Sequence, residues 1–519
     1  MKKNRPPRAG KRSEAGAHET GATLRISPRV TLAAIVCLAA FLRFYNLTGV
    51  PPGLYHDEAM NGTNVLQNLE SHRIEVFYPE NNGREGLYIA LATPVVAAFG
   101  NTSWALRLPA AVFGTATVLG VGLLGIELLG VEEGLLAAFL LATSFWHIVF
   151  SREAFRAILS PFFLCWSLLF LVRALRAARH ASGWAAPACI AAVLYGLGFY
   201  TYIPYRVTPL LVAALLLHAF YAEEPGARTL IVRATALFAG VAAAVAAPLA
   251  WYFWTHPGTF FGRTSQISVT ASAHPLADFL SNVASVAGMF FIQGDPNWRH
   301  NIAGRPELFL PVALFFLGGI AIAALRLRKD PAEARLAPAL LLGWLAAAAA
   351  PAALSNEGIP HSLRAILMTP AVALLAAIGA RQAWRMAEAG LRPAIVPAVA
   401  VLVCAALAGE SYYSYFRVWA PNPEVALALS SNSVAVAERI NALPAETPKY
   451  VVVVNSGELV DGVPMPAEVV MYLTRTYSAE TARQRNVHYL IAPAHSVQEA
   501  RSNCQEALRQ FPPGTAFCL

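Results

Sequence analysis

Acidic side chains are scarce in this sequence, so the place where two of them stand together is the first candidate for chemistry. Aspartate occurs at only five positions, Asp57, Asp278, Asp295, Asp330 and Asp461. Asp57 is followed directly by Glu58, in the segment Gly53-Leu54-Tyr55-His56-Asp57-Glu58-Ala59. Carboxylates beside apolar surface tend to have raised pKa values, which suits a general base. We predict that Asp57 and Glu58 are catalytic; the alternative is a solvated turn or a helix cap.

A third carboxylate ends the same polar stretch. The segment Asn82-Gly83-Arg84-Glu85-Gly86-Leu87-Tyr88 places Glu85 beside a cation and just before a short apolar run. Glu85 is therefore the third predicted catalytic residue. The histidines, among them His56, His147, His218 and His361, show no metal-ligand spacing, so no metal site is predicted from them. The sequence also lacks a phosphate-binding glycine loop and a GxSxG motif.

Arginine is the second unusual feature, because five of these side chains lie near the ends of apolar segments on one predicted face: Arg107, Arg152, Arg156, Arg206 and Arg364. Guanidinium groups bind phosphate oxygens through two parallel hydrogen bonds. Tyr202 lies in the same turn as Arg206, and His361 is close to Arg364 in another. We predict that all seven side chains bind substrate or phosphate. For any single arginine the alternative is that it reaches the membrane surface or pairs with a local glutamate such as Glu153.

The composition shows which elements must position these residues. Apolar residues make up 56% of the chain and charged residues 13%, and the mean hydropathy is +0.48. A soluble protein carries about 25% charged residues. Apolar runs of about twenty residues match the thickness of a bilayer. The chain is therefore predicted to be a polytopic α-helical membrane protein, and the net charge of +8 is ascribed to cytoplasmic loops rather than to nucleic-acid binding.

Eleven apolar segments are predicted to cross the membrane: 30–48, 106–126, 134–150, 159–176, 184–202, 205–221, 233–254, 306–327, 336–354, 365–380 and 393–411. Residues 1–29 are basic and are predicted to form a cytoplasmic tail. Arginines and a lysine flank the alternate loops 177–183, 328–335 and 381–392, which places these loops inside by the positive-inside rule. The long loops 49–105 and 255–305 then face outward. They and the outer turns carry all the candidate residues.

One shorter apolar run, residues 87–100, is too short to span and is predicted to be an interfacial or re-entrant helix. The odd number of spans places the C-terminal tail outside the cytosol. The transmembrane domain is predicted to cover residues 30–415. Residues 420–519 form a small extracytoplasmic α/β domain, with strands at 450–454 and 487–492 and helices at 464–474 and 496–509. Cys504 and Cys518 can form a disulfide there.

These motifs give the sequence a resemblance to a known family. Leu42-Arg43-Phe44, His56-Asp57-Glu58-Ala59, Gly83-Arg84-Glu85-Gly86-Leu87-Tyr88, the stretch from Phe99-Gly100 to Arg107-Leu108-Pro109-Ala110, and Pro360-His361-Ser362-Leu363-Arg364 carry it. The chain resembles the GT-C glycosyltransferases that use polyprenyl-phosphate sugars. Within them it resembles the family 39-like branch of protein O-mannosyltransferases and lipid A aminoarabinose transferases. The likeness covers about residues 30–415 and does not extend to the tail.

The resemblance implies a function. It assigns Asp57 as the catalytic base, includes Glu58 in the same motif, and carries a second acidic role to Glu85. Relatives often have Pro-Pro-Leu where this chain has Glu85-Gly86-Leu87, and an aspartate where this chain offers Glu153. The implied reaction is inverting transfer from a polyprenyl-phosphate sugar to a hydroxyl of lipid A, a protein or a cell-surface glycan.

The implied location is the outer face of the bacterial cytoplasmic membrane. No cofactor is required by the sequence, and a divalent metal is compatible with the family. Two other readings remain open, a flippase or transporter of lipid-linked glycans and a catalytically inactive scaffold. A flippase is expected to carry ionisable groups within its spans, whereas the charge here gathers on one face.

Overall fold

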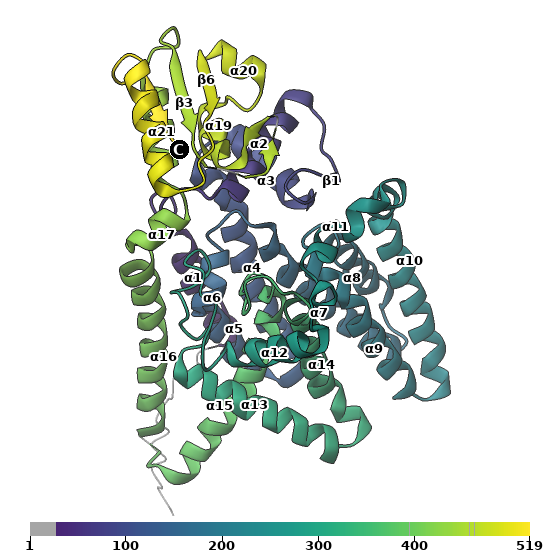
Figure 1. Ribbon diagram of the computed structural model, residues 1–519. Helices are drawn as coiled ribbons and strands as arrows, with labels where there is room; N and C mark the ends of the chain where they lie inside the picture. Colours follow the sequence, from purple (N-terminus) through teal and green to yellow (C-terminus); the bar gives the residue numbers. More distant parts are fainter. Residues whose placement is uncertain (1–26, 394, 456, 461) are drawn as a thin grey trace, which may run out of the picture.

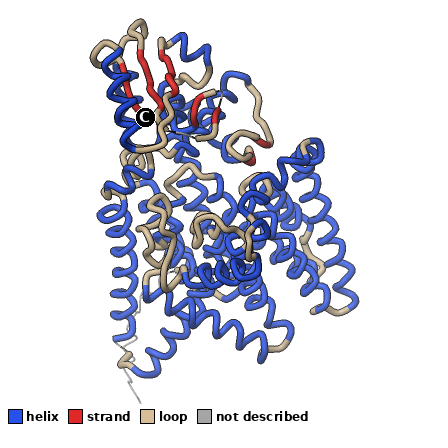
Figure 2. Tube along the Cα trace, in the orientation of Figure 1, coloured by secondary structure: helices blue, strands red, loops and turns tan. Residues whose placement is uncertain are grey.

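The computed structural model describes residues 27–519 apart from residues 394, 456 and 461 and the side chains of residues 332 and 333. Most of the predicted cytoplasmic tail, residues 1–29, lies outside the described residues. Long helices make up the body of the molecule (Figure 1), and most of the strands gather in a small domain at one end of it (Figure 2).

Helices occupy every segment predicted to cross the membrane, because a backbone in lipid must satisfy its own hydrogen bonds. They are α1 (Pro28–Phe44), α4 (Ser103–Leu129), α5 (Val131–Ala142) with α6 (Phe145–Phe150), α7 (Leu159–Arg179), α8 (Ala185–Gly198), α9 (Thr208–Tyr221), α10 (Pro225–Thr255), α13 (Leu310–Lys329), α14 (Leu336–Ala353), α15 (Thr369–Gly390) and α16 (Ile395–Tyr413). Among the described residues, eight helices are long and apolar enough to cross a membrane. The predicted fold class is confirmed, and the exact number of eleven spans stays a prediction.

The remaining predicted spans are shorter in the structure. α1 and α8 have 17 and 14 residues. The segment predicted as one helix over 134–150 is divided into α5 and α6, because the Ser144 side chain accepts a hydrogen bond from the His147 amide at 3.4 Å and so begins a new helix. Part of the predicted membrane domain is therefore built from broken helices.

The first outer segment, predicted as a loop over 49–105, contains two helices and a hairpin. α2 (His56–Ser71) begins at the candidate motif, β1 (Phe77–Tyr78) pairs antiparallel with β2 (Arg84–Glu85), and α3 (Leu87–Phe99) is the predicted short apolar helix. Asp57 and Glu58 lie in the first turn of α2, where the helix dipole favours negative charge. Each candidate carboxylate is thus placed by regular structure.

The other outer segments are short elements that lead into the long helices. α11 (Pro257–Ile267), η3 (Val269–Ala271) and α12 (Pro275–Gly288) precede an irregular stretch, residues 289–309. On the predicted outer side, the 3-10 turns η1 (Arg156–Ile158), η2 (Ile203–Val207) and η5 (Ile366–Met368) begin α7, α9 and α15, and a π-helical turn, η6 (Ser414–Trp419), continues α16. On the predicted inner side, η4 (Ala332–Arg335) begins α14. Arg156 and Arg206 lie in two of these turns.

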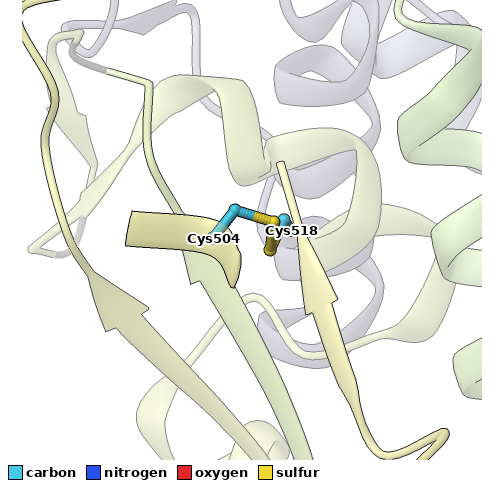
Figure 3. The surroundings of a disulfide bond; sticks show 2 residues. All are labelled: Cys504 and Cys518. Carbon is cyan, nitrogen blue, oxygen red and sulfur yellow. A yellow bond between two sulfur atoms is a disulfide. The ribbon is translucent and has the colours of Figure 1, made fainter. Parts of the chain in front are cut away.

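The C-terminal domain has the predicted mixture of strands and helices. Its parallel sheet has the order β6 (Val487–Ile491), β3 (Lys449–Val453), β7 (Ala516–Cys518), beside the hairpin of β4 (Leu459–Val460) and β5 (Val463–Pro464). Its helices are α17 (Pro423–Ala428), α18 (Ser431–Ala442), α19 (Glu468–Thr474) after the turn η7 (Met465–Ala467), α20 (Ala479–Gln484) and α21 (Val497–Gln510). A disulfide between Cys504 and Cys518 joins α21 to β7 (Figure 3).

This domain packs directly on the helix that begins at the candidate motif. Thr63 on α2 donates a hydrogen bond to Glu468 Oε2 on α19 at 2.7 Å. Gly62 lies so close to the Tyr472 ring that a Cβ atom at that position would come within 2.6 Å of it. α2 is therefore held tightly between the C-terminal domain and the helical body.

Candidate active site

Asp57 keeps an accessible carboxylate. Its side chain is half-buried, and its Oδ1 accepts a hydrogen bond from Asn81 Nδ2 at 2.8 Å. Its charge reaches the neighbouring aromatic side chain, because burial and then Asp57 raise the pKa of Tyr55 to about 12. The Arg299 guanidinium lies 3.9 Å from the centre of the same ring. Asp57 is thus an acid in a partly enclosed place with a cation close by.

Glu58 is fully buried and is paired throughout. Its two oxygens accept hydrogen bonds from Arg107 Nε and Nη2 at 2.8 and 2.9 Å. They also accept the amides of Ala154 and Tyr55 at 2.7 and 3.0 Å, and Arg107 Nη1 donates to the Pro51 carbonyl at 2.8 Å. We therefore assign Glu58 and Arg107 a positioning role rather than the predicted catalytic and phosphate-binding ones. They fix the start of α2 against α4 and the 151–155 turn.

A buried arginine links α2 to the hairpin strand that carries Glu85. Arg84 Nη1 and Nη2 donate to the Asn61 and Asn64 side-chain oxygens at 2.7 and 2.6 Å. Burial lowers the pKa of Arg84 to about 10, with Arg156 acting in the same direction and Asp57 opposing it, so Arg84 stays charged at neutral pH. Because Glu85 is the next residue in the chain, these bonds also fix the position of Glu85 relative to α2.

Glu85 joins two of the predicted arginines, and we call Glu85, Arg156 and Arg206 the Glu85 cluster. The buried carboxylate accepts from Arg156 Nε at 2.9 Å and from Arg206 Nη2 at 3.1 Å. Both guanidinium groups remain partly exposed, at 17% and 18%. Arg206 also stacks on Phe260 at 4.4 Å. One carboxylate thus shares two guanidinium groups, which leaves the cluster with a net positive charge.

A second cluster has the same composition. Glu357 Oε2 accepts from Arg364 Nη2 at 2.7 Å and from Arg263 Nη2 at 2.6 Å, and we call these three residues the Glu357 cluster. Tyr202 lies between the two clusters: its ring is 5.3 Å from Arg156, and Arg364 and Arg263 of the Glu357 cluster interact with it electrostatically. Three guanidinium groups and the Glu85 carboxylate therefore act on one aromatic side chain.

Arg152 does not join either cluster. It is fully buried and donates to the carbonyls of Leu42, Tyr45 and Val50 at 3.1, 2.8 and 2.7 Å. The chain bends after α6 and is extended at Phe155, with φ −92° and ψ 125°, so Arg152 and Arg156 do not share a helix face. The predicted phosphate-binding role of Arg152 is therefore not retained, and Arg152 instead fixes the end of α1.

Glu153 was predicted as a local partner for an arginine, but no ion pair joins it to an arginine of the described residues. It is fully buried, and among the described residues neither carboxylate oxygen has a hydrogen-bond partner. Burial, and then the nearby Glu58, raise its pKa well above the ordinary value. A carboxyl group in these surroundings is held in its neutral form.

His361 occupies a cluster that the sequence did not reveal. Asp295, His300 and His361 offer ligand atoms that all lie within 4.8 Å of one another, and they form the one group of this kind in the searched residues. Asp57 is not part of such a group in the described chain. His300 and Asp295 come from the irregular stretch 289–309, next to Arg299, which contacts Tyr55. The sequence signal that could have indicated this cluster is Asp295, one of only five aspartates, followed five residues later by His300.

The arrangement combines an accessible acid with anion-binding groups. Asp57 can accept a proton. Each arginine cluster has two guanidinium groups and one carboxylate, so it can bind phosphate oxygens while its own carboxylate stays paired. The acid and the cations are linked through one hairpin: the turn between β1 and β2 supplies Asn81, which donates to Asp57, and β2 supplies Glu85, which pairs with Arg156 and Arg206. These are the components of a group transfer in which a phosphate leaves.

Comparison with known proteins supports the predicted resemblance. Residues 87–253 match the family model for dolichyl-phosphate-mannose-protein mannosyltransferases. This region contains Arg107, Arg156, Tyr202 and Arg206 and stops short of the C-terminal domain. A comparison of the sequence with curated proteins finds no match.

Solved structures show the same fold. The oligosaccharyltransferase AglB from Archaeoglobus fulgidus, in complex with an inhibitory peptide and a dolichol-phosphate, superposes with a TM-score of 0.53 at 14% identity, over 89% of this chain and 68% of that one. ArnT from Cupriavidus metallidurans bound to undecaprenyl phosphate gives a TM-score of 0.50 at 14% identity, over 89% of each chain. Its apo state gives 0.51 at 15% identity. The chain therefore has the fold of the GT-C glycosyltransferases.

Proposed function

We propose that this protein transfers a sugar from a polyprenyl-phosphate donor to an acceptor hydroxyl at the outer face of the bacterial cytoplasmic membrane. The observation that carries the proposal is that one hairpin holds both the half-buried Asp57, through Asn81, and the Glu85 cluster. The match of residues 87–253 to the mannosyltransferase family model supports the same class of donor. So does the undecaprenyl phosphate named in the ArnT structure.

In the proposed reaction Asp57 accepts the proton of the acceptor hydroxyl. The acceptor oxygen then forms a bond to the anomeric carbon as the bond between that carbon and the phosphate oxygen breaks. The electron pair of the broken bond leaves on the lipid phosphate, whose negative charge grows. Attack from the side opposite the leaving group inverts the anomeric centre. The acceptor, whether lipid A, a protein or a surface glycan, enters on the Asp57 side.

The phosphate is bound in this proposal by the two clusters. Two guanidinium groups share one carboxylate in each, so each cluster carries an unbalanced positive charge. Arg156 and Arg206 keep part of their surface exposed and can turn donors toward an incoming phosphate. Glu85 then acts as the group that holds both arginines in place, rather than as a second base.

A labelled-donor assay tests the proposal. Purified protein is incubated with radiolabelled polyprenyl-phosphate sugars and extracted cell-envelope acceptors, and transfer is compared between wild type and Asp57→Asn. Asp57→Asn should reduce transfer at least about 100-fold, as loss of a general base does. Asp330→Asn, at the end of α13, is the matched control and should retain full transfer. Wild-type activity without dependence on Asp57 contradicts the mechanism, and movement of lipid across vesicles without sugar transfer indicates a flippase instead.

A further inference from the structure

We propose that Asp295, His300 and His361 bind a divalent cation of the zinc type, and that this cation and a phosphate group bind together. Two separate segments build the cluster: the irregular stretch 289–309 supplies Asp295 and His300, and the turn between α14 and η5 supplies His361. The ligand atoms of the three side chains lie within 4.8 Å of one another. Two imidazoles and one carboxylate are a ligand set that suits zinc and leaves a position open.

The carboxylate is oriented by the chain around it. Asp295 Oδ2 accepts the Ser362 amide and Oδ1 accepts the Asn297 amide, each at 2.8 Å. The Asp295 amide is held by Glu307 Oε1 at 3.0 Å, and the same oxygen accepts the Ser362 hydroxyl at 2.5 Å. Outer contacts of this kind fix the ligands of metal sites.

A metal-free Asp–His pair does not account for the whole cluster. Asp295 and His300 could form such a pair alone, since they share a hydrogen bond. His361 Nδ1 stands 4.0 Å from Asp295 Oδ2, outside hydrogen-bond distance, and its ring centre lies 4.9 Å from that of His300. Two imidazoles brought close together beside one carboxylate, with their planes tilted by 40°, are explained by a shared ligand. A cation is the ligand that all three groups prefer.

The surrounding charge indicates what accompanies the cation. Arg299 directly precedes His300 in the chain, and the Arg364 amide lies 3.5 Å from His361 Nδ1, so both arginines adjoin the cluster. A divalent cation beside two guanidinium groups is repelled unless an anion binds with it. An anion held jointly by the cation and these arginines removes that repulsion, and identifying it with the donor phosphate rests on the proposed function.

The test measures metal binding without using activity. The full chain is purified in detergent, stripped with a chelator, and titrated with Zn²⁺, and with Co²⁺ to follow its visible absorption. We expect about one metal per chain. His300→Gln, His361→Gln and Asp295→Asn should each weaken binding about 100-fold or more. His495→Gln, exposed in the C-terminal domain, is the matched control and should bind like wild type.

A second titration tests the link to phosphate. Because linkage is reciprocal, farnesyl phosphate should tighten Zn²⁺ binding by about tenfold, and Zn²⁺ should tighten farnesyl phosphate binding equally. Arg364→Gln should remove most of this coupling. His361 is partly exposed, so His361→Gln should keep the wild-type melting temperature and still report on the site if Asp295→Asn misfolds.

The outcomes separate this proposal from the proposed function. Less than about 0.1 metal per chain, or wild-type affinity in His361→Gln, overturns the cation site. Unchanged Zn²⁺ affinity with farnesyl phosphate overturns the joint binding. Sugar transfer by chelator-treated, metal-free protein rejects a part for the cation in the reaction, while the transferase proposal stands. Tight, coupled metal binding without any transfer leaves the cation site and rejects the transferase.

Discussion

Asp57 and Glu58 are neighbours in the chain, yet one is half-buried and bonded to Asn81 whereas the other is fully buried and paired with Arg107. The first turn of α2 produces this difference, because consecutive helical residues point about 100° apart and only one of them can face the body of the protein. Replacing Glu58 should therefore lower stability, whereas replacing Asp57 should lower activity.

The first prediction separates these roles by mutation. Glu58→Ala should lower the free energy of unfolding by about 3–5 kcal/mol, because it leaves the Arg107 guanidinium charged and buried without its partner. Asp57→Asn should leave the melting temperature almost unchanged while transfer is lost. Thermal unfolding in detergent, followed by size-exclusion chromatography, measures the stability of both variants, and the labelled-donor assay measures transfer. A stable Glu58→Ala protein would show that the pair is not what fixes the start of α2.

A second prediction concerns the Glu85 cluster. Arg156→Ala should weaken binding of the polyprenyl-phosphate donor by about tenfold or more, the usual effect of losing one charge-assisted hydrogen bond. Arg206→Ala should act similarly, and Arg206→Lys should only partly compensate because lysine lacks the planar fork. Binding is measured by titration of a labelled polyprenyl phosphate. Arg173→Ala, at a partly exposed residue that pairs with Glu127 on the predicted inner side, is the control and should bind normally.

Hydropathy located the membrane helices well because each apolar run carries its own signal along the chain. All eleven predicted segments coincide with helices, and the tail strands at 450–454 and 487–492 were found within a residue or so. The break between α5 and α6 was missed because the segment remains apolar on both sides of Ser144. α2 was missed because a helix that is clamped between two bodies shows no simple apolar stripe.

The site was harder to predict because roles depend on partners far away in sequence. Arg152 and Arg156 have the same chemistry and lie four residues apart, yet one binds main-chain carbonyls and the other Glu85. Only the bend at residues 151–155 separates them. The cluster of Asp295 and His361 requires two loops to meet, with Asp295 and Ser362 separated by 67 positions. No spacing rule in a single sequence reveals such a meeting.

The third prediction concerns the disulfide of the C-terminal domain. In cells, Cys504 and Cys518 should resist alkylation until a reductant is added, because they are joined and lie in the predicted extracytoplasmic domain. Cys504→Ser should lower the stability of this domain by about 3 kcal/mol, the usual value for a loop of this length. Limited proteolysis of residues 420–519 measures that loss. Alkylation of both thiols without reductant would contradict the predicted location of the tail.

The last prediction uses the buried carboxyl of Glu153, whose pKa is raised well above its ordinary value of 4.5 by burial and by Glu58. Above pH 4.5 the unfolded chain has lost this proton while the folded protein still holds it. The folded state then binds more protons than the unfolded state, so the free energy of unfolding must decrease as pH rises through this range. The slope for one such group is about 1.4 kcal/mol per pH unit.

Glu153→Gln removes this titration and leaves the neighbouring Glu58, Arg107 and Arg299 in place. The difference in melting temperature between Glu153→Gln and wild type should therefore grow in favour of the variant as the pH rises above about 5, because only wild type loses stability through this carboxyl group as the pH rises. Comparing the two proteins at each pH cancels the contribution of every other titrating group. Parallel pH curves for wild type and Glu153→Gln would mean that Glu153 is ionised in the folded protein, with a counter-charge close enough to stabilise it.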